Sequence, residues 1–193
     1  MAYILNIETS TTNCSVSLFN DLELIDCIEE NTQDYSHSKS LHVFIDSVLK
    51  NSKISPKDLS AISVSKGPGS YTGLRIGVAS AKGLCYALDI PLISIETLKI
   101  LSQNVFNKGI VIPCLDARRM EVYSAVFNNK NDRIRDTKAE ILTEDSFNKY
   151  LSADEVYFIG NANKKIKKII THKKKEKTRN QQFRFDLLVR TLL

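Results

Sequence analysis

The residues best suited to phosphate chemistry form a glycine-rich segment at positions 67–77. The segment reads Gly-Pro-Gly-Ser-Tyr-Thr-Gly-Leu-Arg-Ile-Gly, and it lies between an apolar run and a helical pattern. Free backbone N–H groups at the start of a helix favour an anion, and glycine lets the backbone approach it closely. Gly67, Gly69 and Ser70 are therefore candidate phosphate-binding residues. The same pattern also fits a tight strand-to-helix turn, and the pattern alone slightly favours that turn.

Two common phosphate-binding motifs do not fit this segment. A Walker loop needs Lys followed by Ser or Thr where this chain has Leu74 and Arg75. The dinucleotide fingerprint needs a third glycine where this chain has Thr72. Glu96 ends the next expected strand, so a Rossmann-like site stays open as an alternative.

A second candidate group ends the first apolar run. Glu8 is followed by Thr9 and Ser10, and a carboxylate beside small hydroxyls suits a magnesium–phosphate site. A turn after a strand carboxylate explains the same residues without a ligand. Asp116 repeats the pattern in the second half of the chain, but no glycine follows it, so close backbone approach to a phosphate is harder. We therefore expect any phosphate site to be degenerate.

The three histidines do not predict a metal site. His37 and His42 lie about 140° apart around a helix, whereas a helical pair of metal ligands needs i, i+4 spacing. His172 stands in a lysine-rich segment. No Ser–His–Asp arrangement is recognisable, so no catalytic residue is expected.

The four cysteines predict buried, reduced thiols. They form no C-x-x-C pair, which argues against a zinc ribbon or a thioredoxin-type redox site. Each stands in an apolar stretch, where a small buried side chain is the expected role. The four are Cys14, Cys27, Cys85 and Cys114.

These candidate residues must be positioned by an α/β fold. Period-two patterns predict strands at 3–8, 14–19, 22–30, 60–66 and 91–96, the first three as an antiparallel meander. Helical periodicity predicts helices at 36–51, 72–88 and 97–106. The order βββαβαβα indicates a mixed sheet with helices on its faces. A smaller set of strands is expected at 110–115, 121–127 and 155–159.

Charge divides the chain into a body and a basic tail. Residues 161–193 hold 11 Lys and Arg against two acidic residues, which leaves 16 basic and 20 acidic residues in 1–160. No aromatic side chains lie among the lysines of 164–177, which favours a solvated segment over an RNA-binding tail. We expect poor packing from about Lys164 onward, because its charges lack partners.

Length and composition limit the class of protein. The chain has 193 residues, of which 42% are hydrophobic and 25% charged, as in ordinary globular domains. No apolar run approaches the ~20 residues of a membrane span, and no signal peptide is recognisable, so a cytoplasmic protein is expected. The expected domains are a first lobe at 1–106, a second lobe at 107–170 and a tail at 171–193.

The helix expected at 72–88 is apolar nearly all round, so it needs cover on more than one side. One face can pack on the sheet, and the remainder predicts a protein–protein interface. Gly73, Gly77 and Gly83 each cost about 1 kcal/mol of helix stability relative to alanine, which close approach of another helix would explain. Val43 points away from the main apolar stripe of the preceding helix and extends this surface.

Five motifs occur in a fixed order along about residues 2–170. They are Ile-Glu-Thr-Ser-Thr at 7–11, His-Ser at 37–38, the segment at 67–77, Ala-Lys-Gly at 81–83 and Asp-Ala-Arg-Arg-x-Glu-Val-Tyr at 116–123. Together they resemble the TsaB family of the glycoprotease-like superfamily. The resemblance implies the two-lobed actin-like ATPase fold, also called ribonuclease-H-like.

The resemblance also implies a function and partners. Such a chain would be the non-catalytic dimerization subunit of the complex that forms threonylcarbamoyladenosine in tRNA, beside the anticodon. It would bind the catalytic subunit TsaD through a bundle made by the first two helices of each chain. It would act with the ATPase TsaE, pair with itself when alone, and reach tRNA through the complex. ATP and Mg would be used by the complex, so no cofactor or metal is expected on this chain.

Two sets of site residues follow from the motifs and the helical pattern. The expected partner interface comprises Leu41, Val43, Phe44, Tyr71, Leu74, Ile76, Val78 and Ala81. The expected degenerate phosphate site comprises Glu8, Thr9, Ser10, Gly67, Gly69 and Ser70.

The end of the chain departs from the family pattern. Family members continue through further helix and strand after the region of Gly160, whereas the composition here changes at Thr171, so an incomplete second lobe is expected. Two other functions stay open: a nucleotide-dependent phosphotransferase using Glu8 and the loop at 67–73, and a direct RNA binder using the basic tail.

Overall fold

The chain folds into two compact units, Met1–Thr97 and a second unit that begins at Leu98. The sequence pattern predicts this boundary further on, between residues 106 and 107. The difference arises because Leu98, Leu101 and Val105 are buried in an apolar cluster of the second unit. The computed structural model describes residues 1–31, 37–105, 109–153, 155–174 and 182–186.

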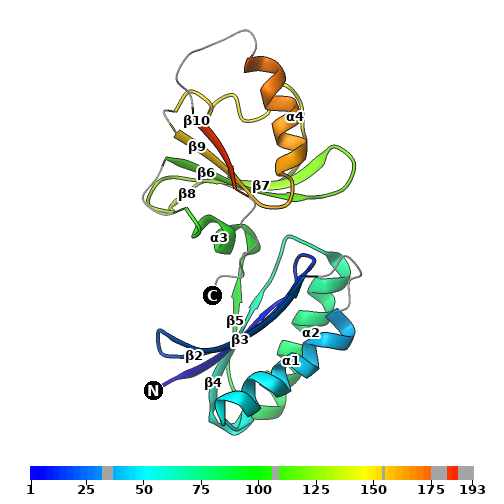
Figure 1. The fold of residues 1–193 in the computed structure, drawn as a ribbon, viewed down its shortest axis with the longest axis vertical. Coiled ribbons are helices and arrows are strands. Elements are labelled where there is room, and N and C mark those ends of the chain that lie inside the picture. The colour runs from blue at the N-terminus through cyan, green and yellow to red at the C-terminus, as the bar shows by residue number, and fades with distance from the viewer. Residues whose placement is uncertain (32–36, 106–108, 154, 175–181, 187–193) are drawn as a thin grey trace. The chain divides into compact units, whose positions relative to one another are not determined.

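The first unit is a mixed sheet with two helices on one face (Figure 1). The strand order is β3-β2-β1-β4-β5, with β1–β2 and β2–β3 antiparallel and β1–β4 and β4–β5 parallel. The expected order βββαβαβα is confirmed as far as α3 (Thr97–Ser102). The other elements are β1 (Tyr3–Glu8), β2 (Asn13–Asn20), β3 (Glu23–Asn31), α1 (His37–Ser52), the 3-10 turn η1 (Pro56–Asp58), β4 (Leu59–Ser65), α2 (Tyr71–Leu88) and β5 (Leu92–Ile95).

Alternation along the strands decides which face of this sheet the helices cover. The helix-facing side chains form one core with α1 and α2. The opposite face is polar: Asn6 Nδ2 donates to Ser17 Oγ at 3.4 Å, and Ser63 Oγ donates to Asn6 Oδ1. The core includes Leu5, Ile7, Cys14, Val16, Leu18, Leu41, Ile45, Val48, Leu49, Ile62 and Val64.

Helix α2 packs on the sheet through small residues. Its buried positions are Gly73, Gly77, Ala81 and Cys85, spaced four apart along one side. Larger apolar residues of the helix are only half-buried beside this line, namely Leu74, Val78, Leu84 and Leu88. The helix can therefore lie close to β1 and β4, because no bulky side chain separates them.

The second unit repeats the sheet topology of the first. Its order is β10-β9-β6-β7-β8, with β6–β7 and β7–β8 antiparallel and β6–β9 and β9–β10 parallel. The strands are β6 (Ile110–Asp116), β7 (Glu121–Phe127), β8 (Arg133–Ile141), β9 (Glu155–Ile159) and β10 (Gln182–Asp186), with helix α4 (Asn163–Lys174). The sequence pattern does not predict β8, α4 or β10. The second sheet has five strands, like the first, and the expectation that this lobe is shorter than in the family stays a prediction.

In the second sheet, the neighbouring strands β6 and β9 are buried on both faces. Along β9, Val156 and Phe158 belong to one apolar cluster, whereas Tyr157 and Ile159 belong to another. The first cluster includes Ile166 of α4. The second cluster packs under α3. A strand buried on both faces reads as a nearly continuous apolar run, as β6 and β9 do.

The expectation of a poorly packed tail from Lys164 is wrong for the described part of the tail. Ile166 is fully buried and Ile169 packs partly against the same cluster. Their i, i+3 spacing puts both on one side of α4, so the lysines between them can stay in water. β10, inside the predicted tail, pairs in parallel with β9. Residues 175–181 and 187–193 lie outside the described residues.

Three of the four cysteines are buried as expected, but Cys27 is exposed. It lies on β3, an edge strand of the first sheet, where one side of the strand meets water. In the described part of the chain, no helix combines the length and apolar character needed to cross a membrane.

Candidate functional site

The two candidate phosphate-binding segments, residues 8–10 and 67–70, meet at one end of the first sheet. β1 and β4 are parallel neighbours, so the residues that follow them, 8–10 and 67–70, lie at the same edge. This brings together all six residues of the expected phosphate site.

The contacts join these residues to one another. Glu8 Oε1 accepts hydrogen bonds from Ser10 N at 2.6 Å and from Ser65 Oγ at 2.8 Å. Ser70 N donates to the Ser10 carbonyl at 2.6 Å. Thr9 Oγ1 donates to the Gly73 carbonyl at 2.8 Å.

Two glycines permit this close fit. A Cβ at Gly69 would stand 2.3 Å from the Ser10 carbonyl oxygen, and a Cβ at Gly77 would stand 2.2 Å from Thr9 Oγ1. Real Cβ atoms do not approach oxygen so closely, so any other residue would push the segments apart. The helical pattern predicts that Gly77 makes room for an approaching partner helix. The structure instead places Thr9 of the same unit against it.

These contacts hold the loop after β1 against the start of α2. We call the residues that make them, 8–10, 69–73 and Gly77, the loop clamp. The Ser70 hydroxyl accepts from Gly73 N at 3.2 Å as the helix N-cap, and its backbone N–H is bound to Ser10. These groups are engaged within the protein rather than directed at a ligand. The Ser10 hydroxyl is buried and has no hydrogen-bond partner among the described residues.

Asp116, the acidic residue of the second unit that corresponds to Glu8, also forms hydrogen bonds within the protein. Asp116 Oδ1 accepts from Arg118 N at 2.7 Å and from Lys165 Nζ at 2.7 Å. Among the described residues, no group of three or more His, Cys, Asp and Glu side chains is arranged to hold a metal ion. The side chains of His37 and His172 lie outside the described residues.

The second candidate is the outer surface of α1 and α2, which lie side by side on the first sheet (Figure 1). Ser80 Oγ and His42 Nε2 are 3.2 Å apart across the two helices. Val43 is 59% exposed and Tyr71 is 69% exposed, and the Arg75 guanidinium lies 3.8 Å from the centre of the Tyr71 ring. These residues form an unpartnered surface of mixed aromatic, apolar and basic character.

The structure divides the expected interface residues into two groups. Leu41 and Ala81 have no exposed surface, because both are buried in the core of the first unit, so neither can contact a partner directly. Phe44, Ile76 and Val78 are half-buried and pack against that core. Leu74 is half-buried as well. Val43 and Tyr71 are exposed and can contact a partner directly.

Several exposed residues of α2 are not among the expected interface residues. Tyr86 is 92% exposed, and Ala79, Lys82 and Gly83 are exposed with it. Together with Tyr71 and Arg75 they follow one side of the helix at intervals of three and four. We call Val43, Tyr71, Arg75, Ala79, Lys82, Gly83 and Tyr86 the helix surface. The signal was present in the sequence, since these positions lie opposite the small-residue line of α2.

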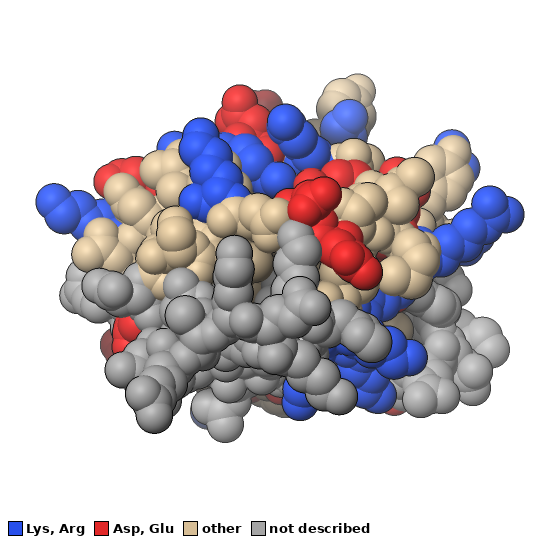
Figure 2. Space-filling model, turned by 90° about the horizontal axis from the view of Figure 1, so that it is seen from above, with Lys and Arg blue, Asp and Glu red and all other residues tan. Residues whose placement is uncertain are grey.

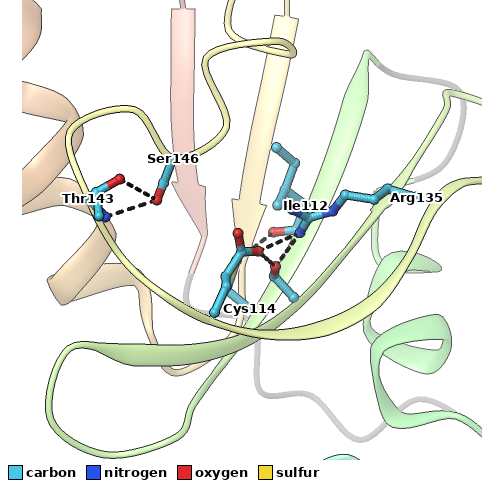
Figure 3. Close-up of polar contacts among 7 residues, drawn as sticks. Ile112, Cys114, Arg135, Thr143 and Ser146 are labelled. Atoms are coloured by element: carbon cyan, nitrogen blue, oxygen red, sulfur yellow. Dashed lines mark hydrogen bonds and ion pairs between the residues drawn. The ribbon is translucent and has the colours of Figure 1, made fainter.

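A polar cluster inside the second unit was not expected from the sequence (Figure 3). Arg135 Nη2 and Glu140 Oε1 form an ion pair at 2.7 Å, and the Ser124 hydroxyl contacts both. Burial raises the pKa of the Cys114 thiol, Glu140 raises it further and Arg135 lowers it. The cluster links β7 to β8 within the core, which is a structural role.

Comparison with known proteins decides the family. The family described as TsaD, tRNA N6-adenosine threonylcarbamoyltransferase, matches residues 30–186. The chain belongs to this family. Its relatives include the tRNA threonylcarbamoyladenosine biosynthesis protein TsaB of Bacillus subtilis (strain 168), 38% identical over 133 residues, covering 66% of this chain and 56% of the relative. The TsaB of Escherichia coli (strain K12) is 34% identical over 134 residues, covering 68% and 57%.

The chain is thus a TsaB-type member of the TsaD family, as its motifs suggested. Its matches span little more than half the length of these curated relatives. The structure titled YeaZ from Pseudomonas aeruginosa superposes with a TM-score of 0.73 at 23% identity, covering 97% of this chain and 86% of that one. The expected actin-like, ribonuclease-H-like fold is confirmed.

Proposed function

We propose that this chain is a non-catalytic scaffold subunit in the formation of threonylcarbamoyladenosine in tRNA. It holds a TsaD-type catalytic subunit through the helix surface, acts with a TsaE-type ATPase, and pairs with a second copy when the catalytic subunit is absent. A cytoplasmic location follows from this role. The exposed helix surface carries the proposal, and the names of the TsaB relatives support its direction.

The composition of the helix surface suits a protein partner. Tyrosine and arginine are enriched among residues that dominate protein–protein binding, and the Tyr71–Arg75 pair already presents a stacked anchor. Small residues at Ala79 and Gly83 let another helix approach closely, since a Cβ at Gly83 would meet nothing within 4 Å. Helix α2 contains no acidic residue, so a partner helix with carboxylates is favoured.

Capture of the catalytic subunit tests this proposal. A tagged TsaD from the same source would be mixed with the parent chain, Val43→Glu and Tyr86→Glu. Both variants should lose affinity by about tenfold or more, because a carboxylate would be desolvated within the interface. Leu22→Glu is the matched control, since Leu22 is 97% exposed at the β2–β3 turn, away from the helix surface.

The outcomes are distinguishable. If Val43→Glu and Tyr86→Glu fold normally and still capture TsaD as the control does, the interface lies elsewhere. Ile76→Glu is a poor probe, because Ile76 packs against the core and a buried carboxylate would disturb folding.

The non-catalytic part of the proposal is tested on the isolated chain. The engaged groups of the loop clamp favour no Mg-dependent ATP turnover. Turnover that disappears in Glu8→Ala would support the phosphotransferase alternative instead.

A further inference from the structure

We infer that the second unit binds single-stranded or loop RNA on a surface formed by the β6–β7 turn and the first half of α4. The residues are Arg118, Arg119, Lys164 and Lys168, called here the basic surface, with the adjoining Met120 and Ile141. This goes beyond the proposed scaffold role, since it assigns a direct ligand to a unit that the helix surface does not include.

The turn and the helix are fixed to each other by one carboxylate oxygen. Asp116 Oδ1 accepts both Arg118 N and Lys165 Nζ at 2.7 Å, and Lys165 Nζ also lies 3.5 Å from the Glu121 carbonyl oxygen. Lys165 therefore faces the turn. At about 100° per residue, Lys168 lies about 60° and Lys164 about 100° around α4 from Lys165. Both are exposed, on the side of α4 that faces away from the buried Ile166.

The two arginines have positive charges that the described residues do not neutralise. Arg118 and Arg119 are exposed, and no ion pair to either is found in the described part of the chain. The nearby Asp116 is occupied by Lys165. Figure 2 shows Lys and Arg side chains in several groups on one face, with Asp and Glu among them. The basic surface is therefore distinguished by two neighbouring arginines without ion pairs to any described residue, and not by an excess of positive charge over the whole face.

The backbone of the turn holds these arginines in an uncommon conformation. Arg118 has φ +71° and Arg119 has φ +42°, both in the left-handed region. A side chain there costs roughly 1 kcal/mol, which glycine would avoid. Residues kept in such conformations occur more often at binding sites than elsewhere. A binding role for both guanidinium groups would explain why arginine, rather than glycine, occupies these two strained positions.

A surface cavity adjoins the arginines. Its volume is about 500 Å³, and it is lined by Ala117, Arg118, Arg119, Met120, Glu121 and Ile141. Met120 is 45% exposed and Ile141 is 67% exposed, so the cavity has an apolar wall open to water. An unstacked base fits such a wall, and its amino group can donate to the Glu121 carboxylate.

Positive charges beside an apolar cavity wall favour RNA with unpaired bases over a free anion or a duplex. Lysines on α4 suit the phosphates, guanidinium planes suit stacking with bases, and the apolar wall suits a base face. A duplex keeps its bases stacked inside the helix and could use only the charges.

Fluorescence anisotropy of the full chain tests the inference. The probes are a labelled RNA hairpin with an unpaired loop and a fully paired RNA of the same length. The parent should bind the hairpin more tightly, with affinity falling steeply from about 50 to 200 mM salt. Arg118→Gln with Arg119→Gln should weaken binding at least fivefold and reduce the salt slope by about 1.4.

Three variants complete the experiment. Lys164→Gln with Lys168→Gln should weaken binding similarly at exposed helical positions where folding is not at risk. Arg118→Lys with Arg119→Lys should keep the salt slope but not the full affinity, because lysine cannot stack. Lys57→Gln with Lys130→Gln is the charge-matched control: Lys57 lies in the first unit, and Lys130 lies at the opposite end of β7 from the turn.

The inference is overturned if the basic-surface variants and the control lose affinity equally, if paired RNA binds as well as the hairpin, or if the parent does not bind at low salt. Capture of TsaD is measured separately on the same variants and should be unchanged. Loss of RNA binding and failure of the proposed scaffold role are therefore distinguishable.

Discussion

Gly77 of α2 lies directly against Thr9 of the loop after β1, so that a Cβ on Gly77 would stand 2.2 Å from the Thr9 hydroxyl oxygen. The same hydroxyl donates to the Gly73 carbonyl at 2.8 Å, one turn earlier in the helix. The glycines of α2 therefore serve different purposes in the structure. Gly77 serves the fold of its own unit, whereas Gly83 faces open space.

This difference predicts opposite effects of one substitution. Gly77→Ala should lower the free energy of unfolding by about 1–3 kcal/mol, because the methyl group forces Thr9 away. Gly83→Ala should raise it by about 0.5–1 kcal/mol, because alanine favours an exposed helix position. Urea denaturation of both variants measures the two changes. Shifts of the same sign would contradict the assignment of Gly77 to the loop clamp.

The ion pair in the second unit should contribute to stability. Arg135 and Glu140 side chains are 15% and 24% exposed, so Glu140→Gln leaves a poorly solvated guanidinium with a weaker partner. The free energy of unfolding should fall by about 2 kcal/mol. Asp136→Asn is the control, since Asp136 is 89% exposed and 3.8 Å from Arg133, and should change stability by less than about 1 kcal/mol. Equal losses in thermal or urea unfolding would show that the pair has no special role.

Cys14 should make stability fall at alkaline pH. Burial, together with smaller contributions from Glu30 and Glu8, raises the pKa of the Cys14 thiol from 9.0 to about 11. The neutral thiol is favoured in the folded state, so its contribution is complete below pH 9 and is lost as pH rises from about 9 to 11. The loss should reach about 2–3 kcal/mol.

The measurement compares the parent with Cys14→Ala by urea denaturation at several pH values. The cavity left by alanine costs the same at every pH, so the stability margin of the parent should shrink between pH 9 and 11. A margin that is independent of pH would rule out this titration.

Cys27 should be the first cysteine to react with a thiol reagent. It is exposed, whereas Cys14, Cys85 and Cys114 are buried. Partial burial raises the pKa of Cys27, and Glu29 and Asp26 add to the effect, so its reaction should be slow at neutral pH and accelerate as pH rises. Reaction with an aromatic disulfide under native conditions measures this. Cys27→Ser should remove the fastest phase, and Cys85→Ser should leave it in place.

The strands and helices of the first unit could be predicted because their patterns are local. The period-two runs of β1, β2 and β4 and the helical stripe of α1 each needed only neighbouring residues. β8 and β10 were missed because β8 is largely polar and exposed, and because the charge of the tail obscured the alternation of Gln-Phe-Arg-Phe-Asp at 182–186.

The sequence by itself determined the family, the order of the first eight elements and the two segments that form the loop clamp. Tertiary structure decided how those segments are used. Parallel pairing of β1 with β4 brings Thr9 and Ser10 against Gly69, Ser70 and α2, so groups that could bind phosphate bind one another instead. It also decided that Ala81 is buried and Tyr86 exposed, because the side of a helix that meets a sheet depends on residues distant in the chain.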